Sequence, residues 1–163
     1  MKTKALMILA CLAFCFSCDD PYENIPDDKS YNGKPFVSLS SESGVINLNG
    51  TTKGALTDSV ALSHRQDHDI TVTLELVERF TVGEVGTHFT YENNLTIPAG
   101  AFYGHFKAEA LDVKEDGDVK ISDYKLSVRI KSVDDPNIIP GLYGNKLEGE
   151  ERQKRYKTIS FRK

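Results

Sequence analysis

The sequence predicts an all-β fold, an antiparallel β-sandwich of about seven strands over residues 35–163. Three observations predict it. Apolar residues recur at every second position in most apolar segments, which is the period of a half-buried strand. Turn sequences such as Asn49-Gly50 and Pro98-Ala99-Gly100 separate these segments. No window of helical length carries a convincing stripe of apolar residues with a period of 3.6.

Residues 1–17 are expected to be a signal peptide. Lys2 and Lys4 precede an unbroken apolar run that ends at Phe16. A membrane span needs about 20 apolar residues, whereas a signal peptide needs roughly 7–15, and this run has the shorter length. The junction at Ser17 and Cys18 resembles the lipobox of bacterial lipoproteins, although Cys15 and Phe16 depart from it. The resemblance implies cleavage between Ser17 and Cys18 and acyl chains such as palmitate on Cys18. The alternative is an ordinary signal peptide cut nearby, without a lipid.

Residues 18–34 are expected to form a lipidated cysteine followed by an acidic, solvated tether. Asp19 and Asp20 resemble a signal that sends lipoproteins to the cell surface in one phylum of glycan-degrading Gram-negative bacteria. We therefore expect a lipid-anchored protein of the outer membrane that is exposed at the cell surface; the alternative is the periplasmic face. Without Lys2 and Lys4, 18 basic residues face 24 acidic ones, a net charge of −6. This charge argues against a nucleic-acid partner.

The strands are expected in the following order. Short segments of apolar residues predict strands at 36–39, 45–48 and 58–62, before the first clear one at 70–77. There Ile70, Val72, Leu74 and Leu76 share one face. Two short strands follow at 89–91 and 94–97, and a longer one at 101–110 is expected to turn Phe102, Phe106, Ala108 and Ala110 inward.

The last two predicted strands cover 123–131 and 156–161. In the first of them Tyr124, Leu126, Val128 and Ile130 alternate with polar residues. The second lies in a basic stretch, so we expect it to be a solvated edge strand whose lysines discourage aggregation; the basic residues are Arg152, Lys154, Arg155, Lys157, Arg162 and Lys163. The domain has no tryptophan and no cysteine beyond Cys18, so the sandwich is immunoglobulin-like or fibronectin-like in architecture only.

Residues 69–131 resemble a Calx-β-like or related immunoglobulin-like sandwich of small surface lipoproteins and glycan-binding proteins in that same phylum. The segments that carry the resemblance are Ile70–Leu74, Gly86–Thr90, Leu95–Gly100 and Tyr124–Val128. The resemblance implies a fold and a cellular context. His88 departs from it, because the related pattern has an aspartate at that position.

An acidic loop is the candidate metal site. It contains Asp112, Glu115, Asp116 and Asp118, whose carboxylate oxygens are ligands that calcium prefers. The loop lacks the spacing of an EF-hand, and carboxylates beside a glycine are also typical of solvent-facing turns. Calcium is therefore an alternative, and otherwise no cofactor is expected.

Two groups of side chains are candidate contact surfaces. Residues 136–149 form a Pro- and Gly-rich loop whose apolar members are Ile138, Ile139, Leu142 and Tyr143. These residues either contact a partner or fold back over an open edge of the core. The seven tyrosines are the candidates for stacking against sugar rings: Tyr22, Tyr31, Tyr91, Tyr103, Tyr124, Tyr143 and Tyr156.

No enzymatic activity is expected. The sequence has no cysteine beyond Cys18 to act as a nucleophile, no G-x-S-x-G elbow, no phosphate loop and no dinucleotide fingerprint. We expect a non-catalytic surface lipoprotein that is an accessory or binding component of an outer-membrane assembly, in particular one for glycan uptake. Its partners would be the membrane, an outer-membrane transporter or other surface lipoproteins, and a glycan. The alternatives are a direct glycan- or calcium-binding module, and an adhesion or pilus-type subunit that pairs by strand addition.

Overall fold

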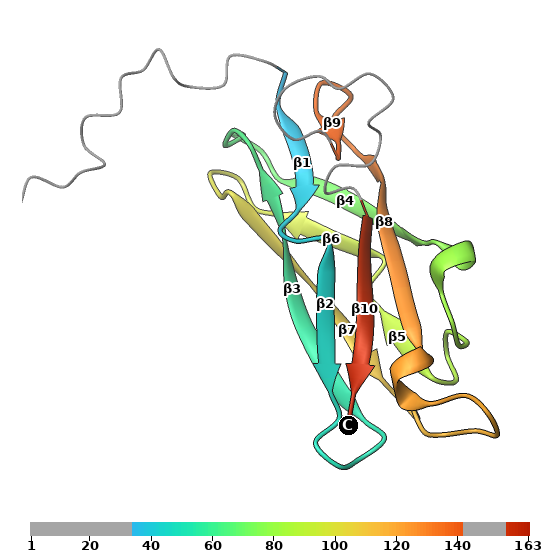
Figure 1. Ribbon diagram of the computed structural model, residues 1–163. Coiled ribbons are helices and arrows are strands. Elements are labelled where there is room, and N and C mark those ends of the chain that lie inside the picture. Colours follow the sequence, from blue (N-terminus) through green and yellow to red (C-terminus); the bar gives the residue numbers. More distant parts are fainter. Residues whose placement is uncertain (1–33, 142–155) are drawn as a thin grey trace, which may run out of the picture. The chain divides into compact units, whose positions relative to one another are not determined.

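Two five-stranded β-sheets pack face to face in the computed structural model, which describes residues 34–141 and 156–163 (Figure 1). The first sheet has the order β5 (Phe89–Tyr91), β7 (Tyr103–Ala110), β3 (Gly54–Leu62), β1 (Phe36–Leu39), β9 (Ile139–Pro140). The second sheet has the order β2 (Ser43–Asn47), β10 (Tyr156–Arg162), β8 (Lys125–Val133), β4 (Ile70–Leu76), β6 (Asn94–Ile97). The prediction of an all-β sandwich is confirmed.

The described residues form ten strands, more than the seven or so expected for the sandwich; nine of them overlap the segments predicted above, and β9 is the strand that the sequence did not indicate. The prediction of an antiparallel arrangement is wrong for two pairs, because β1 pairs with β9 and β2 with β10 in parallel. The reason lies between β1 and β2. The chain leaves the first sheet after Leu39 and enters the second at Ser43, so consecutive strands do not pair with each other.

Within residues 34–141 and 156–163, two short 3₁₀ helices interrupt the strand pattern, η2 (Glu78–Phe80) and η3 (Ile121–Asp123). In the described part of the chain, no helix has the length and apolar character needed to cross a membrane.

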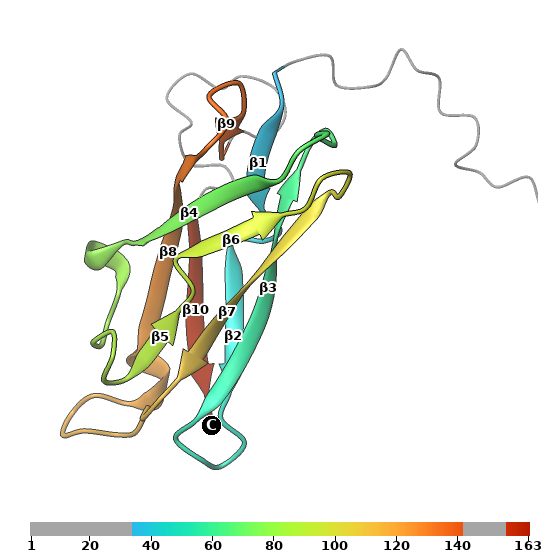
Figure 2. The same ribbon diagram turned by 180° about the vertical axis from the view of Figure 1, so that it is seen from behind.

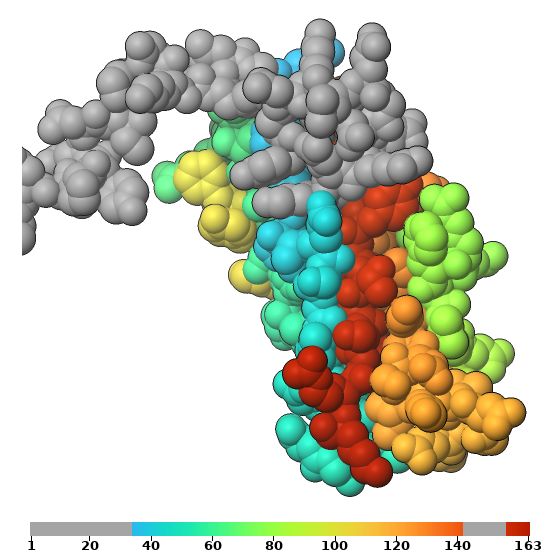
Figure 3. All heavy atoms as spheres, in the orientation of Figure 1, coloured from blue at the N-terminus to red at the C-terminus, as the bar shows by residue number. Residues whose placement is uncertain are grey.

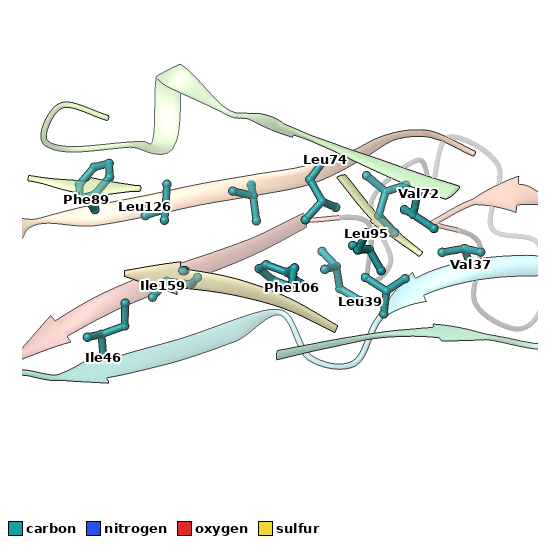
Figure 4. Packing of buried hydrophobic residues seen from close by; sticks show 14 of the residues in the cluster. Val37, Leu39, Ile46, Val72, Leu74, Phe89, Leu95, Phe106, Leu126 and Ile159 are labelled. Atoms are coloured by element: carbon teal, nitrogen blue, oxygen red, sulfur yellow. The ribbon is translucent and has the colours of Figure 1, made fainter. Parts of the chain in front are cut away.

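The core lies between the facing surfaces of the two sheets (Figure 4). Ile70, Val72 and Leu74 of β4 are at most 2% exposed, as the alternation predicted. The inward row of β8, with Leu126, Val128 and Ile130, is fully buried. The ring of Phe89 stacks on that of Phe161 with 5.6 Å between centroids. Burying such side chains contributes roughly 1.5–3 kcal/mol each, so this core is the main source of stability.

The prediction that Phe102 belongs to the core is wrong, because 38% of it is exposed. The strand β7 begins at Tyr103, after Phe102, and the first inward position on it is Gly104. A Cβ atom at Gly104 would lie 2.8 Å from the carbonyl oxygen of Thr96 in β6, so the two strands approach too closely for a side chain. Phe102 instead lies beneath the guanidinium of Arg65, 4.5 Å from it.

The prediction of a solvated edge strand at 156–161 is also wrong. Strand β10 lies inside the second sheet, with β2 on one side and β8 on the other, as Figures 1 and 2 show from opposite directions. Lys157 points inward, in the same row as Ile159 and Phe161, and only 1% of it is exposed. The other basic residues from 152 to 155 lie outside the described residues.

Candidate functional site

The predicted lipid-attachment and export residues lie outside the described residues. This applies to Ser17, Cys18, Asp19 and Asp20, and also to Leu142 and Tyr143 of the predicted contact loop. These assignments stay predictions. The other two members of the contact loop are described. Ile138 is 4% exposed and belongs to the core, so its side chain offers no contact surface. Ile139 is half-buried and lies in β9, where it pairs with Phe36 of β1.

The acidic loop between β7 and η3 is held by local contacts. Asp112 forms an ion pair with Lys114, with 2.6 Å between Oδ2 and Nζ, and this hydrogen bond and a second one from Thr52 lower the pKa of Asp112. Asp116 pairs with Val119 through the backbone. Among residues 34–141 and 156–163, no group of three or more His, Cys, Asp or Glu side chains is arranged to hold a metal ion. Calcium binding at Asp112, Glu115, Asp116 and Asp118 stays a prediction without support from this geometry.

The structure points instead to the outer face of the second sheet, where the segment after β4 loops out and returns. The backbone N–H of Val77 donates to the carbonyl of Ser127 at 2.8 Å, and Val82 exchanges hydrogen bonds with Lys125 at 2.8 and 3.0 Å. The chain is thus paired with β8 on both sides of η2. Residues 78–81, between these two anchors, project from the sheet edge as a fixed protrusion (Figure 3).

Thr81 closes the base of this protrusion. Its hydroxyl donates to the carbonyl of Val77 at 3.0 Å and accepts the backbone N–H of Ser127 at 3.1 Å. A side chain therefore replaces the backbone acceptor that a regular strand would have supplied at this point. Ser127 is fully buried, so an unpaired N–H there would carry the cost of desolvation.

A row of side chains crosses the sheet beside η2. Glu75 of β4, Arg129 of β8 and Tyr156 of β10 are register neighbours. The guanidinium of Arg129 donates to the carboxylate of Glu75 and, through Nη1, to the hydroxyl of Tyr156 at 3.3 Å. These two hydrogen bonds, the one to Tyr156 more than the one to Glu75, raise the pKa of Arg129. Lys131 lies 3.9 Å from the other oxygen of Glu75.

Two adjoining hollows open on this surface. One of about 490 Å³ is lined by Leu76, Val77, Glu78, Arg79, Arg129 and Tyr156. The other, of about 290 Å³, is lined by Arg79, Phe80, Val82, Lys125 and Thr158. Arg79 belongs to both and stands between them. Both are shallow and open to solvent, so together they suit an extended ligand lying along the surface better than an enclosed small molecule. We call the surface made by Glu78, Arg79, Phe80, Lys125, Arg129 and Tyr156 the η2 face.

The η2 face carries exposed apolar groups beside cations. Phe80 is 48% exposed, and Val82, which lines the smaller hollow beside it, is 43% exposed. The guanidinium of Arg79 lies 4.5 Å from the centroid of the Phe80 ring. No carboxylate in the described part of the chain lies within ion-pair distance of Arg79 or Lys125.

Other hollows are less suited to a ligand. One of about 510 Å³ is lined by Lys53, Gly54, Ala55, Glu109, Ala110 and Leu111, and it offers no aromatic ring. Another of about 390 Å³ lies beside η3, and the one aromatic residue on its lining, Phe161, is 3% exposed. A hydroxyl and imidazole pair, Ser59 and His105 at 3.0 Å, lies on the outer face of the first sheet and outside these hollows.

The sequence indicated only part of the η2 face. Tyr156 is among the tyrosines named above as stacking candidates, but Arg79, Phe80, Lys125 and Arg129 carried no signal of their own. Their proximity depends on the register of β4, β8 and β10, which alternation within one strand does not determine. The single local hint is the segment Glu78–Phe80, where an aromatic residue directly follows two charged ones at the end of a strand.

Solved structures show what the fold is similar to. A protein of unknown function from Bacteroides ovatus matches with a TM-score of 0.59 and 10% identity, over 80% of this chain and 52% of that one. The Calx CBD1 domain in its apo form matches with a TM-score of 0.53 and 16% identity, over 78% and 96%. A second Bacteroides ovatus protein, described as a "putative carbohydrate binding protein", matches with 0.53 and 13%, over 78% and 37%.

These likenesses confirm the Calx-β-like sandwich as the fold. At such low identities they establish the fold alone, and this chain spans about half or less of the first Bacteroides structures it matches. No family model matches the sequence, and no curated protein matches it.

Proposed function

We propose that the protein is a non-catalytic binding module that holds a glycan on the η2 face. We propose further that it is lipid-anchored at Cys18 and is an accessory of an outer-membrane assembly for glycan uptake. The observation that carries the proposal is the pair of adjoining hollows with aromatic rings and cations on their walls. Sugar sites combine an apolar surface for the ring with a few placed polar groups, and this face supplies both.

The arrangement of the aromatic residues supports a glycan as ligand. Phe80 on η2 lines one hollow and Tyr156 on β10 lines the other, so an extended chain of sugars across both would meet a ring in each. Tyr156 is positioned by its hydrogen bond with Arg129, and Phe80 by the backbone anchors of η2. Rigid aromatic groups of this kind contribute contact area at a small cost in conformational entropy.

The fold comparison is consistent with this proposal, because one similar structure belongs to the protein described as a "putative carbohydrate binding protein". The cellular context has a different source. It rests on the predicted signal peptide, on the resemblance of Ser17 and Cys18 to a lipobox and on the acidic residues Asp19 and Asp20.

Affinity electrophoresis through gels that contain plant, host or bacterial polysaccharides tests the proposal. We expect retardation by at least one polysaccharide, and a loss of that retardation in Phe80→Ala and Tyr156→Ala. Tyr103→Ala is the matched control, since Tyr103 is 57% exposed on the outer face of the first sheet. Retardation that persists in both η2-face variants, or that Tyr103→Ala abolishes equally, would move the site away from the η2 face.

A further inference from the structure

The η2 face is positively charged although the protein is acidic. It and the adjoining row carry four cations, Arg79, Lys125, Arg129 and Lys131, against the two carboxylates Glu75 and Glu78. The whole chain has a net charge of −4. A local excess of cations on an acidic protein attracts anions to that face and repels them elsewhere.

The cations differ in how far they are neutralised. Arg129 and Lys131 both face Glu75, so this carboxylate compensates for part of their charge. Arg79 and Lys125 have no carboxylate within 4 Å in the described part of the chain, and they line the same hollow of about 290 Å³. The positive charge that no carboxylate neutralises is therefore that of Arg79 and Lys125, and it lies in the hollow where a ligand would bind.

The position of Arg79 suits the recognition of an anion. Its guanidinium is stacked against the face of Phe80, and η2 is anchored to β8 on both sides. A guanidinium stacked on a ring has its edge N–H groups free to form two parallel hydrogen bonds with a carboxylate or sulfate. Lys125, on the other wall of the hollow, adds a second positive charge from β8.

We infer that the ligand is an anionic glycan, whose sugar units carry carboxylate or sulfate groups that bind Arg79 and Lys125. This inference rests on the proposed function, since it assigns the substrate class of the same face. The ring of a charged sugar unit would contact Phe80 or Tyr156, and its anionic group would lie in the hollow between η2 and β8.

Titration calorimetry with paired polymers tests this inference. The first pair is polygalacturonate and its methyl-esterified form, which share a backbone and differ in carboxylate charge. The second pair is a sulfated glucan and the same glucan without sulfate. We expect the anionic member of at least one pair to bind at least tenfold more tightly than its neutral partner. The pair that shows the difference identifies carboxylate or sulfate as the recognised group.

Variants separate a specific site from general charge attraction. Arg79→Gln and Lys125→Gln are each expected to weaken binding of the anionic polymer by about tenfold to a hundredfold, the effect of losing one charge-assisted hydrogen bond. Lys53→Gln is the matched control, because it makes the same charge change beside another hollow. An equal loss in Lys53→Gln would overturn the inference, since the attraction would then be nonspecific.

Two further outcomes are distinguishable. Equal binding of the charged and neutral polymers, lost in Phe80→Ala and Tyr156→Ala, would overturn the anionic specificity and leave the proposed glycan site standing. Failure to bind any glycan, charged or neutral, by a protein shown to be folded by its circular dichroism would overturn the proposed function itself.

Discussion

Lys157 is a charged residue inside the sandwich. Its ammonium pairs with the carboxylate of Asp58 in β3 and donates to the hydroxyl of Ser41 at 2.5 Å and the carbonyl of Ser43 at 2.9 Å. The other oxygen of Asp58 accepts the hydroxyl of Ser40 at 2.6 Å and the N–H of Ser59 at 2.7 Å. The buried pair thus joins β3, β10 and the crossover from β1 to β2. Among the described residues no buried side-chain polar atom lacks a partner.

Removing one member of this pair is expected to destabilise the protein strongly. Asp58→Asn leaves the Lys157 ammonium buried without a counter-charge, which costs about 3–5 kcal/mol of unfolding free energy. The double variant Asp58→Leu with Lys157→Met removes both charges and should cost clearly less than Asp58→Asn alone. Urea denaturation measures both. The control is Glu109→Gln in the exposed pair with Lys107, where we expect less than about 1 kcal/mol. A similarly small effect in Asp58→Asn would contradict this account.

The same pair predicts a pH dependence. Burial raises the pKa of Asp58, but the hydrogen bonds from Lys157, Ser40 and Ser59 outweigh it, so the pKa lies below its ordinary value. The unfolded chain therefore takes up this proton first as the pH falls. The stabilisation from Asp58 is present above about pH 3.9 and is lost as the pH falls from there through the lower folded-state pKa. Urea midpoints between pH 6 and pH 2.5 should fall less steeply in the double variant. If the urea midpoints of the wild-type protein and the double variant fell equally steeply with pH, Asp58 would not be the source of the pH dependence.

At the level of elements, the close contact of β6 and β7 requires a glycine. A Cβ at Gly104 would lie 2.8 Å from the carbonyl oxygen of Thr96 and 2.6 Å from a methyl of Leu95. Gly104→Ala is expected to cost about 1–3 kcal/mol, because the backbone of β6 has to move. Gly44→Ala is the comparison. There the shortest contact, 2.8 Å, is with a methyl at the end of the Leu56 side chain, which moves more easily than backbone, while the held Lys157 side chain lies 3.0 Å away. Thermal unfolding ranks the two variants, and a larger loss in Gly44→Ala would contradict this explanation.

The protrusion at η2 depends on the Thr81 hydroxyl. Thr81→Val keeps the shape and suits the extended backbone at this position, φ −98° and ψ 130°, but removes the acceptor for the N–H of Ser127. We expect a loss of about 1–3 kcal/mol in stability and faster hydrogen exchange at Val77 and Val82. The proposed glycan binding should also weaken, since Arg79 and Phe80 are positioned by η2. Thr73→Val on the outer face of β4 is the matched control. Unchanged exchange at Val77 would show that the hydroxyl is dispensable.

Alternation within a strand predicted which residues point inward, and for β4 and β8 it was right. It failed where the cause lies in another element. Phe102 lies against Arg65 of another segment and stays outside the core, and Lys157 is buried with Asp58 and Ser41 as partners. The η2 face also depends on contacts between elements, since Arg79, Lys125 and Tyr156 come together only through the order of β4, β8 and β10 in the sheet. A single strand's pattern contains no information about its neighbours.

At the scale of the whole molecule, the anchor is the prediction most directly open to test. Cells grown with a palmitate analogue should label the protein, and Cys18→Ala should abolish the label, because the resemblance to a lipobox assigns the acyl chains to that residue. Cys15→Ala is the matched control and should retain it. Label that survives in Cys18→Ala would contradict lipidation at this site.

Surface exposure has a test of its own. Proteinase treatment of intact cells reports on which side of the membrane the protein lies, and the double variant Asp19→Ala with Asp20→Ala should be cleaved less if these residues direct surface export.

The position of β10 has a consequence for how the protein acquires its fold. Strand β2 finds its sheet neighbour only when β10 is present, and the hydroxyl of Ser160 contacts the carbonyl of Gly44 from 116 residues further along the chain. Of the described strands, β10 leaves the ribosome last. Until then the second sheet lacks an inner strand, and both β2 and β8 present an unpaired edge. Pairing over such a separation is slow, so we expect the second sheet to be completed late in folding.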